Sequence, residues 1–208
     1  MKKKKDKLAA QLRVLAGVLV GFFLTHRMRL VIFESCLGGI LPHHITNHDR
    51  AGSVLEEGRV VFSKRAKIRL GVPEWLLDKY GPYHPVIAAA MALAGLILAP
   101  EADVSISATG TVAKADERYP ENSIPGLIFD CHARRGEGSC FEFNLRSRQH
   151  KDHGQRSGVK KIGAIAIMQS CLLDFVQNSF EFKISFNGNA DEFYRQLERI
   201  VLEKPAKG

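Results

Sequence analysis

The apolar positions of the chain form two kinds of run, one spaced as in α-helices and the other as in β-strands. The helix-like segments are residues 8–24, 38–46, 64–70, 74–80, 85–98, 157–176 and 190–203. The shorter β-rich runs are residues 29–33, 59–62, 103–108, 124–133, 139–145 and 180–186. Helices that alternate with strands and then give way to a hairpin predict a single three-layer α/β/α domain built on a mixed sheet.

Prolines and polar stretches mark where several of these segments end. Pro85 suits the first turn of a helix, where its missing N–H is not needed, and Pro100 stops the apolar helix that follows. The polar residues 134–138 separate two β-like runs, which predicts an antiparallel hairpin. Residues 109–122 and 146–156 are charged connections, and long loops of this kind are usually functional or disordered.

The N-terminal segment combines a basic run with an apolar one. Residues 1–7 hold five lysines against one aspartate, and residues 14–24 are apolar without interruption. This order resembles a secretory signal, but no small-residue cleavage site follows, and the apolar run is too short to cross a bilayer core. Extending the segment back to Leu8 gives a helix with Gln11 and Arg13 for its solvent face. The sequence favours a first helix packed on the domain over an export signal or membrane anchor, with residues 1–7 as a basic tail.

Composition and charge are those of one soluble globular domain. The chain has 208 residues, of which 45% are hydrophobic and 25% charged, and its formal net charge is +8. That charge suits an anionic partner such as a nucleotide, but no aromatic–basic interleaving points to nucleic acid. The four cysteines form no CxxC pair, so we expect reduced thiols and a cytoplasmic location.

The segment Glu34–Gly39 leaves a predicted strand and enters a predicted helix through two glycines. Gly38 and Gly39 permit close backbone approach. The N-terminal amides and dipole of the helix favour an anion there, either a phosphate or a developing oxyanion. On its own, such a Ser-x-x-Gly-Gly turn is more often structural than catalytic. The rest of the chain decides how Ser35 is interpreted.

Further motifs follow this turn in order. They are Phe62-Ser63-x-x-Ala66-Lys67 with Leu70-Gly71-Val72, then Ser105-Ile106-Ser107-x-Thr109-Gly110, then Gly126, and finally the helix that starts near Arg156 with Val159, Lys160 and Lys161. In combination, these motifs resemble the C-terminal domain of the CinA family, whose similar members hydrolyse the amide of nicotinamide mononucleotide without a metal. The likeness spans residues 8–176 and leaves residues 177–208 as a C-terminal strand–helix extension.

The resemblance implies a hydrolase site made of a serine and a lysine. The family's motif serine and lysine correspond to Ser35 and Lys67. A lysine can take the serine proton when desolvation or nearby positive charge lowers its pKa. Lys64, Arg65 and Arg69 stand close to Lys67 in the sequence and could supply that charge. The resemblance implies no cofactor and no metal, and it also implies a homo-oligomer.

A small nucleotide is the expected substrate, held by residues around this pair. By resemblance, Thr109 and Gly110 lie in a loop beside the substrate, where they bind it or support an oxyanion. Basic residues such as Arg156 could meet the phosphate. The full expected binding set is Glu34, Gly38, Gly39, Phe62, Thr109, Gly110 and Arg156.

The chain departs from the family pattern around the same pair. Leu37 stands where the family has threonine, Phe62 where it has tyrosine and Lys64 where it has asparagine, and residues 111–114 lack the family's glycine-rich continuation. Losing hydrogen-bonding groups from a pocket affects substrate recognition more than folding. The alternative hypothesis is therefore a catalytically impaired CinA-like protein that binds nucleotides or a partner protein.

Histidines and one cysteine offer other chemistry. His43, His44 and His48 include an i, i+4 pair able to hold a metal, but no carboxylate or cysteine completes the site, so surface histidines are expected. The two histidines and the aspartate within residues 150–153 are interpreted as a solvated loop. Cys36 is either a thiol nucleophile near a helix N-terminus or a buried apolar residue, and burial is expected.

Overall fold

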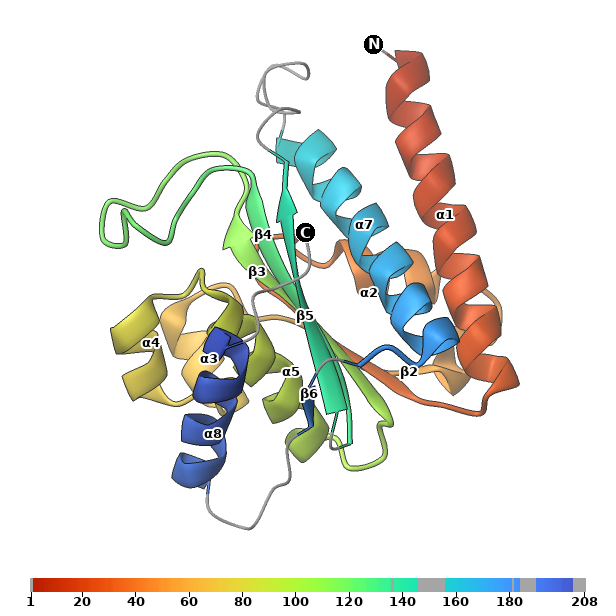
Figure 1. Cartoon of the computed structure of the whole chain (residues 1–208). Helices are drawn as coiled ribbons and strands as arrows, with labels where there is room; N and C mark the ends of the chain where they lie inside the picture. The colour runs from red at the N-terminus through yellow and green to blue at the C-terminus, as the bar shows by residue number, and fades with distance from the viewer. Residues whose placement is uncertain (1, 136, 146–155, 181, 184–189, 204–208) are drawn as a thin grey trace.

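The computed structural model describes residues 2–135, 137–145, 156–180, 182–183 and 190–203. These residues form a mixed sheet of six strands in the order β2-β1-β3-β4-β5-β6, with helices on both faces (Figure 1). The strands are β1 (Leu30–Glu34), β2 (Leu55–Val60), β3 (Val104–Thr111), β4 (Leu127–Arg134), β5 (Glu137–Asn144) and β6 (Phe182–Lys183). The predicted α/β/α arrangement with a mixed sheet is confirmed.

Strand direction places the loops that matter for function. β1 runs parallel to both of its neighbours, β2 and β3. β3, β4, β5 and β6 pair in antiparallel fashion, and β4–β5 is the predicted hairpin. Because parallel strands end on the same side, the carboxyl ends of β1, β2 and β3 meet at one edge of the sheet. The segments that follow these three strands therefore come together at this edge.

The helices divide between the two faces of the sheet, as Figure 1 shows. The helices on one face are α1 (Lys2–Thr25), α2 (Ile40–Thr46) and α7 (Arg156–Gln177). Those on the other are α3 (Lys64–Leu70), α4 (Glu74–Tyr80), α5 (Pro85–Leu98) and α8 (Ala190–Glu203). A short 3-10 turn, Ala51–Ser53, precedes β2. Side chains alternate across a strand, so Ile32 packs into the core beneath α1 and α7 and Phe33 into the core beneath α5.

Helix α5 rests directly on the strand that leads to the candidate site. Its start matches the prediction, since Pro85 occupies the first turn and the His84 side chain accepts a hydrogen bond from the Val86 N–H at 3.2 Å. A Cβ at Gly95 would lie 2.3 Å from the ring of Phe33. Glycine at this position therefore allows α5 to approach β1 closely.

Two strand predictions were wrong in extent. The second strand was expected at residues 59–62 but spans Leu55–Val60. It is the edge strand, so charged side chains replace the apolar pattern that marks an inner strand. The third strand was expected to end at Ala108 and to pass Thr109 and Gly110 into a loop. It continues to Thr111 because these residues pair with β4.

Helix α1 packs on the domain, as predicted. It begins at Lys2, so the run expected to be a tail is helical in its backbone. Its inner side chains belong to the core shared with α2 and α7; they are Leu12, Ala16, Leu19, Val20 and Phe23. Residues Lys7–Thr25 are also long and apolar enough to pass for a membrane span by length and composition alone.

The C-terminal segment continues the same layers. β6 pairs with β5 at the edge of the sheet, and α8 contacts α5. The predicted helix at 190–203 is confirmed, and Phe193, Tyr194 and Leu197 of α8 are buried in the α5 core. Of the predicted strand at 180–186, Phe182–Lys183 is described as β6, and residues 184–189 lie outside the described residues.

A buried ionic cluster joins β4 to α7. His132 Nε2 lies 2.5 Å from Asp130 Oδ2, and His132 Nδ1 lies 3.4 Å from Asp174 Oδ2. Ser179 donates a hydrogen bond to Asp174 Oδ1 at 3.1 Å. Burial alone would lower the pKa of His132, but the two carboxylates outweigh burial and raise that pKa to about 9. The imidazole is therefore a cation at neutral pH, enclosed between two acidic groups.

Candidate active site

Ser35 lies at the edge where the three parallel strands end. It follows the last residue of β1, and its N–H donates to the carbonyl of Ala108 in β3 at 2.8 Å. The Val61 N–H, just after β2, donates to the carbonyl of Glu34 at 2.7 Å. These two bonds hold the start of the turn between the ends of β2 and β3.

Lys67 reaches the same place from α3. Ser63 caps this helix by accepting a hydrogen bond from the Ala66 N–H at 3.1 Å, and Gly71 ends it with a left-handed φ of 111°. Residues three positions apart share a helix face, so Lys67 and Leu70 both point inward, and both are buried. The cap and the glycine thus fix the two turns of helix that aim the lysine at the sheet edge.

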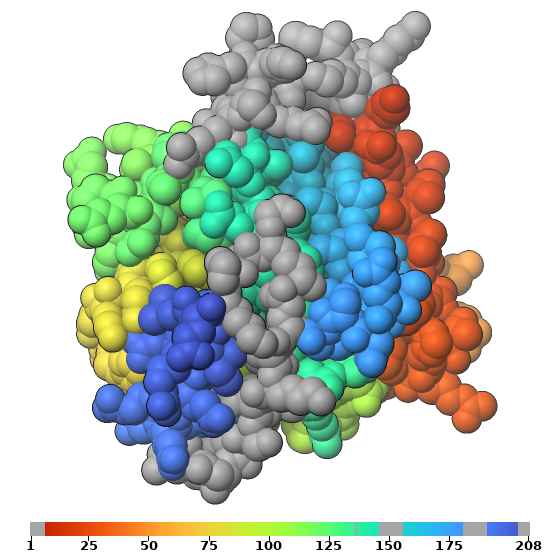
Figure 2. Space-filling view, viewed as in Figure 1, coloured from red at the N-terminus to blue at the C-terminus, as the bar shows by residue number. Residues whose placement is uncertain are grey.

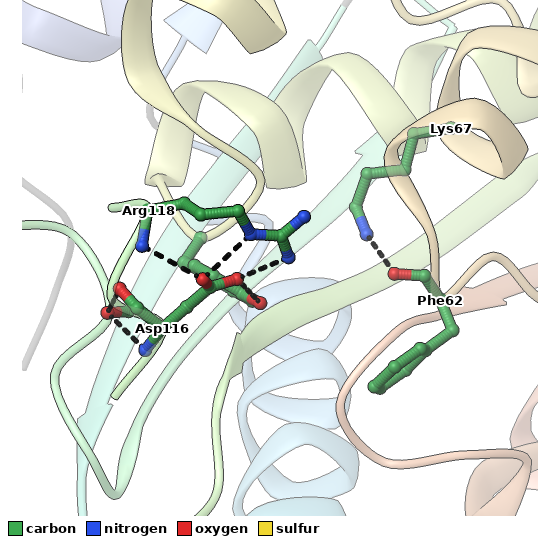
Figure 3. Close-up of polar contacts among 6 residues, drawn as sticks. Phe62, Lys67, Asp116 and Arg118 are labelled. Atoms are coloured by element: carbon green, nitrogen blue, oxygen red, sulfur yellow. Dashed lines mark hydrogen bonds and ion pairs between the residues drawn. The ribbon is translucent and has the colours of Figure 1, made fainter. Parts of the chain in front are cut away.

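The ammonium of Lys67 meets the hydroxyl of Ser35. Lys67 Nζ lies 2.9 Å from Ser35 Oγ and 2.9 Å from the carbonyl oxygen of Val61. It also donates to the carbonyl of Phe62 at 3.4 Å, the contact drawn in Figure 3. In the neutral amine, two N–H bonds can serve the two carbonyls while the lone pair faces the serine hydroxyl. The two side chains expected to pair from the sequence are therefore within hydrogen-bonding distance of each other.

Burial lowers the pKa of Lys67 to about 8, because water no longer solvates the charged ammonium. The neighbouring cations that the sequence offered are not the cause. Lys64 instead pairs with Asp78 and Glu74 at the surface. A lysine with this pKa has a substantial neutral fraction in mildly alkaline solution, so it can act as a base.

The N-terminus of α2 already holds an anion. The carboxylate of Glu34 accepts a hydrogen bond from the Gly39 N–H, one from the Ile40 N–H at 3.0 Å and one from the Leu41 N–H at 2.6 Å. Glu34 is fully buried, and burial raises its pKa although the three amides favour the carboxylate. From the sequence, a substrate phosphate or an oxyanion was expected at this helix start, but the carboxylate of Glu34 occupies the Gly39, Ile40 and Leu41 amides.

The two glycines of the turn adopt conformations that other residues avoid. Gly38 and Gly39 have φ values of 74° and 95°. A Cβ at Gly38 would stand 2.9 Å from the ammonium of Lys160, which reaches the turn from α7. The sequence associated Lys160 with the family helix but gave it no place in the site. Only the fold shows that α7 brings this cation beside Ser35 and its turn.

Known proteins are similar to this chain in sequence and in fold. The family model described as the CinA C-terminal domain matches residues 13–167, well over half of the chain. The chain belongs to the CinA C-terminal domain family. A CinA-like protein of Chlorobium phaeobacteroides is 34% identical over 139 residues, which cover 66% of this chain and 32% of that protein. A CinA-like protein of Desulfovibrio desulfuricans is 39% identical over 116 residues, covering 55% of this chain and 27% of that protein.

The chain spans between 27% and 38% of the length of curated relatives such as these. Solved structures of CinA-superfamily proteins have the same fold. One from Klebsiella pneumoniae superposes with a TM-score of 0.71 at 20% identity, covering 80% of this chain and 98% of that one. One from Escherichia coli gives 0.66 at 24% identity, with coverage of 79% and 90%. At these identities the likeness establishes the fold.

The Thr109-Gly110 motif of this CinA chain is part of the sheet. The hydroxyl of Thr109 is buried and donates to the carbonyl of Pro82 at 2.6 Å. Gly110 has a φ of 142°, and a Cβ there would stand 2.3 Å from the carbonyl oxygen of Leu127. Both residues therefore serve strand pairing and the packing of the segment before α5, at the edge where Ser35 lies.

The remaining members of the expected CinA binding set lie nearer the surface. The side chain of Phe62 is 73% exposed, while its carbonyl faces Lys67. Arg156 is exposed at the first residue of α7, one turn before Lys160. Leu37, which replaces the family's threonine, is buried in the core under α7.

The charged connection after β3 is held by its own ion pair. Asp116 Oδ2 lies 2.8 Å from Arg118 Nη2, and it accepts a hydrogen bond from Tyr83 Oη at 3.0 Å. Figure 3 shows the guanidinium of Arg118 turned onto the Asp116 carboxylate. The Asn122 side chain donates to the carbonyl of Tyr80 at 2.8 Å. This connection is thus fastened to the segment around α4, on the same side of the sheet as Lys67.

The other chemical candidates have structural places. Cys36 is buried, and burial raises the pKa of its thiol to about 12, so the burial interpretation describes it. The ring of His48 contacts the carbonyl of Arg13 at 2.9 Å, while His43 contacts Asn47. The described residues include no group of three or more histidine, cysteine or acidic side chains able to hold a metal. The cluster predicted within residues 150–153 lies outside the described residues.

The solvent exposure of Ser35 and Lys67 bears on whether the chain is a hydrolase or a binding module. Ser35 is 2% exposed and Lys67 fully buried. The pair is therefore well shielded from water, which suits a desolvated base. In this conformation the hydroxyl of Ser35 has little contact with solvent.

Proposed function

We propose that this protein is a metal-independent amidohydrolase that deamidates nicotinamide mononucleotide or a related amide, with Ser35 as nucleophile and Lys67 as base. One observation carries the proposal: a buried lysine ammonium stands 2.9 Å from a serine hydroxyl at the carboxyl end of a parallel strand. Membership of the CinA family supports the same reading. A serine hydroxyl becomes nucleophilic when an adjacent base takes its proton.

The chemistry follows from that contact. Neutral Lys67 takes the proton of Ser35 as Oγ bonds to the amide carbon, giving a tetrahedral oxyanion. The carbon–nitrogen bond then breaks, and the proton held by Lys67 passes to the leaving nitrogen, which departs as ammonia. Water attacks the resulting ester with Lys67 again as base. The carboxylic acid is released, and the hydroxyl of Ser35 is restored.

Backbone amides and one lysine are available for the charges of such a substrate. The N–H groups of Leu37 and Gly38 make no hydrogen bond with another described residue, so they can face a developing oxyanion. The position of Lys160 beside Gly38 supports a role for this cation in binding a phosphate, and Arg156, one turn earlier, is the alternative. The family resemblance adds Thr109 and Gly110 to the same binding region.

The deciding experiment follows ammonia release from nicotinamide mononucleotide by the purified chain. Formation of the acid product in step with ammonia supports the proposal, and loss of both in Ser35→Ala assigns them to this site. Ser53→Ala, which removes an exposed hydroxyl in the 3-10 turn before β2, serves as a matched control. It should keep most of the activity of any protein that remains folded. Absence of turnover at high enzyme concentration contradicts the proposal.

The pH dependence of the reaction should report the lysine. Because the pKa of Lys67 is lowered to about 8, the neutral base forms as the pH rises through that value. We expect kcat/KM to increase from pH 6 and to level off above about pH 9, with a single ionisation near 8. A profile that is flat over this range, or one that falls as pH rises, argues against a lysine base.

A second function is favoured by the burial of the serine. Ser35 is only 2% exposed, and Leu37 is buried in the core. The amides at the start of α2 are bound to the carboxylate of Glu34. These features would suit a module that binds a nucleotide or a partner protein without turnover. Calorimetry with nicotinamide mononucleotide separates the two functions. Binding without ammonia release supports the module, and efficient turnover excludes it.

A further inference from the structure

Helix α1 has an apolar surface on both sides, although one side is already packed. Its inner face lies in the core with α2 and α7, where the rings of Phe23 and Phe175 of α7 pack edge to face with their centroids 5.7 Å apart. Its outer face carries Val14, 62% exposed, and Val18, 52% exposed. From residue 14 to residue 24 no charged or hydrogen-bonding side chain interrupts the helix. A helix on the surface of a soluble domain ordinarily presents polar residues outward.

The apolar outer face of α1 continues across α7. The two helices border a groove of about 370 Å³, lined by Lys7, Ala10, Gln11, Val14, Leu15, Ile165 and Gln169. Leu173 and Val176 lie further along the same stripe of α7, at helical spacing from Gln169, and both are exposed. Figure 2 shows α1, in red, and α7, in blue, forming one flank of the molecule. We call this area the α1–α7 face.

Basic residues border the α1–α7 face. Lys7 lines the groove, Arg13 is exposed on α1, and Arg27 is exposed just after the helix ends. The sequence of the first turn of α1 adds Lys2, Lys3, Lys4 and Lys5. Asp6 is the only acidic residue before Glu34. An apolar helical stripe flanked by cations is the pattern of segments that lie in the interface of an anionic bilayer.

We propose that the α1–α7 face docks on an anionic lipid bilayer, with α1 lying parallel to the membrane plane. Crossing the bilayer would require α1 to leave its core partners, because Leu12, Leu19 and Phe23 are buried against the domain. Lying in the interface keeps those contacts and covers Val14 and Val18. The cations match negatively charged headgroups, whereas a second copy of this chain would bring the same cations and no acidic counterpart.

Docking leaves the Ser35–Lys67 pair uncovered. Lys67 and α3 lie on the opposite face of the sheet from α1 and α7 (Figure 1), whereas Lys160 and Arg156 of the proposed phosphate site belong to α7. Vesicle binding is measured without substrate, so either proposal can fail without the other.

The test is flotation of the full chain with vesicles of phosphatidylcholine alone and of phosphatidylcholine mixed with phosphatidylglycerol. We expect binding to the anionic vesicles and little to the neutral ones, weakened by salt because the attraction is partly electrostatic. Val14→Ser/Val18→Ser should lower binding by roughly tenfold or more, since two exposed apolar side chains no longer enter the interface. Ile97→Ser/Leu98→Ser is the matched control, because these exposed residues of α5 lie on the other side of the sheet.

Three outcomes overturn the proposal. One is the absence of binding to anionic vesicles. Another is unchanged binding by Val14→Ser/Val18→Ser, which would leave only a nonspecific attraction to the lysine run. The last is a concentration-dependent dimer in light scattering that the same two substitutions abolish, which would assign the face to a second copy. Circular dichroism and thermal unfolding should match the unsubstituted chain, since both valines are exposed.

Discussion

Lys67→Met is expected to lose hydrolysis by about three orders of magnitude or more, because the hydroxyl of Ser35 then has no base to take its proton. Ser35→Ala should lose a comparable amount, since the nucleophile is gone. The double variant should be little worse than either single one, because the two side chains act as one unit and their effects do not add. The measurement is kcat/KM for ammonia release at pH 9, where the lysine of the unsubstituted chain is largely neutral.

The fold should survive the loss of this charge. A methionine fills nearly the same space as the buried lysine, and it removes a cation whose desolvation opposes folding below its pKa. We therefore expect a melting temperature at pH 7 within a few degrees of the unsubstituted chain. Lys64→Met is the matched control, because Lys64 lies on the same helix but pairs with Asp78 at the surface. That variant should keep its activity.

Two results would contradict the assignment of Lys67. One is a folded Lys67→Met protein with activity within tenfold of the unsubstituted chain. The other is an equal loss in Lys64→Met, which would trace the effect to α3 and not to the base. Either result would favour the alternative hypothesis, in which the protein is a nucleotide-binding module without turnover.

From the sequence, the resemblance to the CinA family joins Ser35 and Lys67, because neither local motif is specific by itself, and in the structure the two side chains lie 2.9 Å apart. Ser35 follows a strand and precedes two glycines, while Lys67 lies between the cap Ser63 and the terminator Gly71. Local signals of this kind survive folding. What brings the two residues together is the parallel pairing of β1 with β2, which places the start of α3 beside the turn.

Other features depend on contacts that no local pattern encodes. The carboxylate of Glu34 takes the helix amides that were expected to hold a substrate anion, because β1 and α2 meet closely at the turn. Lys160 reaches Gly38 only because α7 returns over α2. The bounds of the edge strand β2 were set incorrectly from the sequence, because a run of charged residues is more typical of a loop than of a strand. In each case a tertiary contact decides what the residue does.

His132→Phe is expected to destabilise the folded chain by about 3–5 kcal/mol, the usual effect of removing one partner from a buried ion cluster. Asp130 and Asp174 would then remain buried without the cation between them. The free energy of unfolding in urea at pH 7 measures the effect. Ile106→Val, a small change at the residue that pairs with His132 across β3 and β4, is a control for packing, with an expected cost of about 1 kcal/mol.

The variant Asp130→Leu/His132→Phe should recover much of that loss. It removes a charge of each sign together and leaves Asp174 with its hydrogen bond from Ser179. Apolar groups of similar volume often replace a buried pair without net cost. If the double variant is as unstable as the sum of its single substitutions, the cluster is held by packing and not by charge.

The sign of the pH dependence follows from the raised pKa of His132. A group whose pKa rises from 6.5 to about 9 on folding stabilises the folded chain fully below pH 6.5, and this contribution is lost as the pH rises through 9. The lowered pKa of Lys67 has the opposite effect, since it makes the folded chain more stable as the pH rises above about 8. The stability of the unsubstituted chain is therefore compared with that of Asp130→Leu/His132→Phe, which keeps Lys67. The stability advantage of the unsubstituted chain over that variant should shrink by on the order of 2 kcal/mol between pH 6.5 and pH 9. An advantage that is constant across this range would mean that His132 carries no charge in the folded protein. The link between β4 and α7 would then be a hydrogen-bonded one, independent of pH.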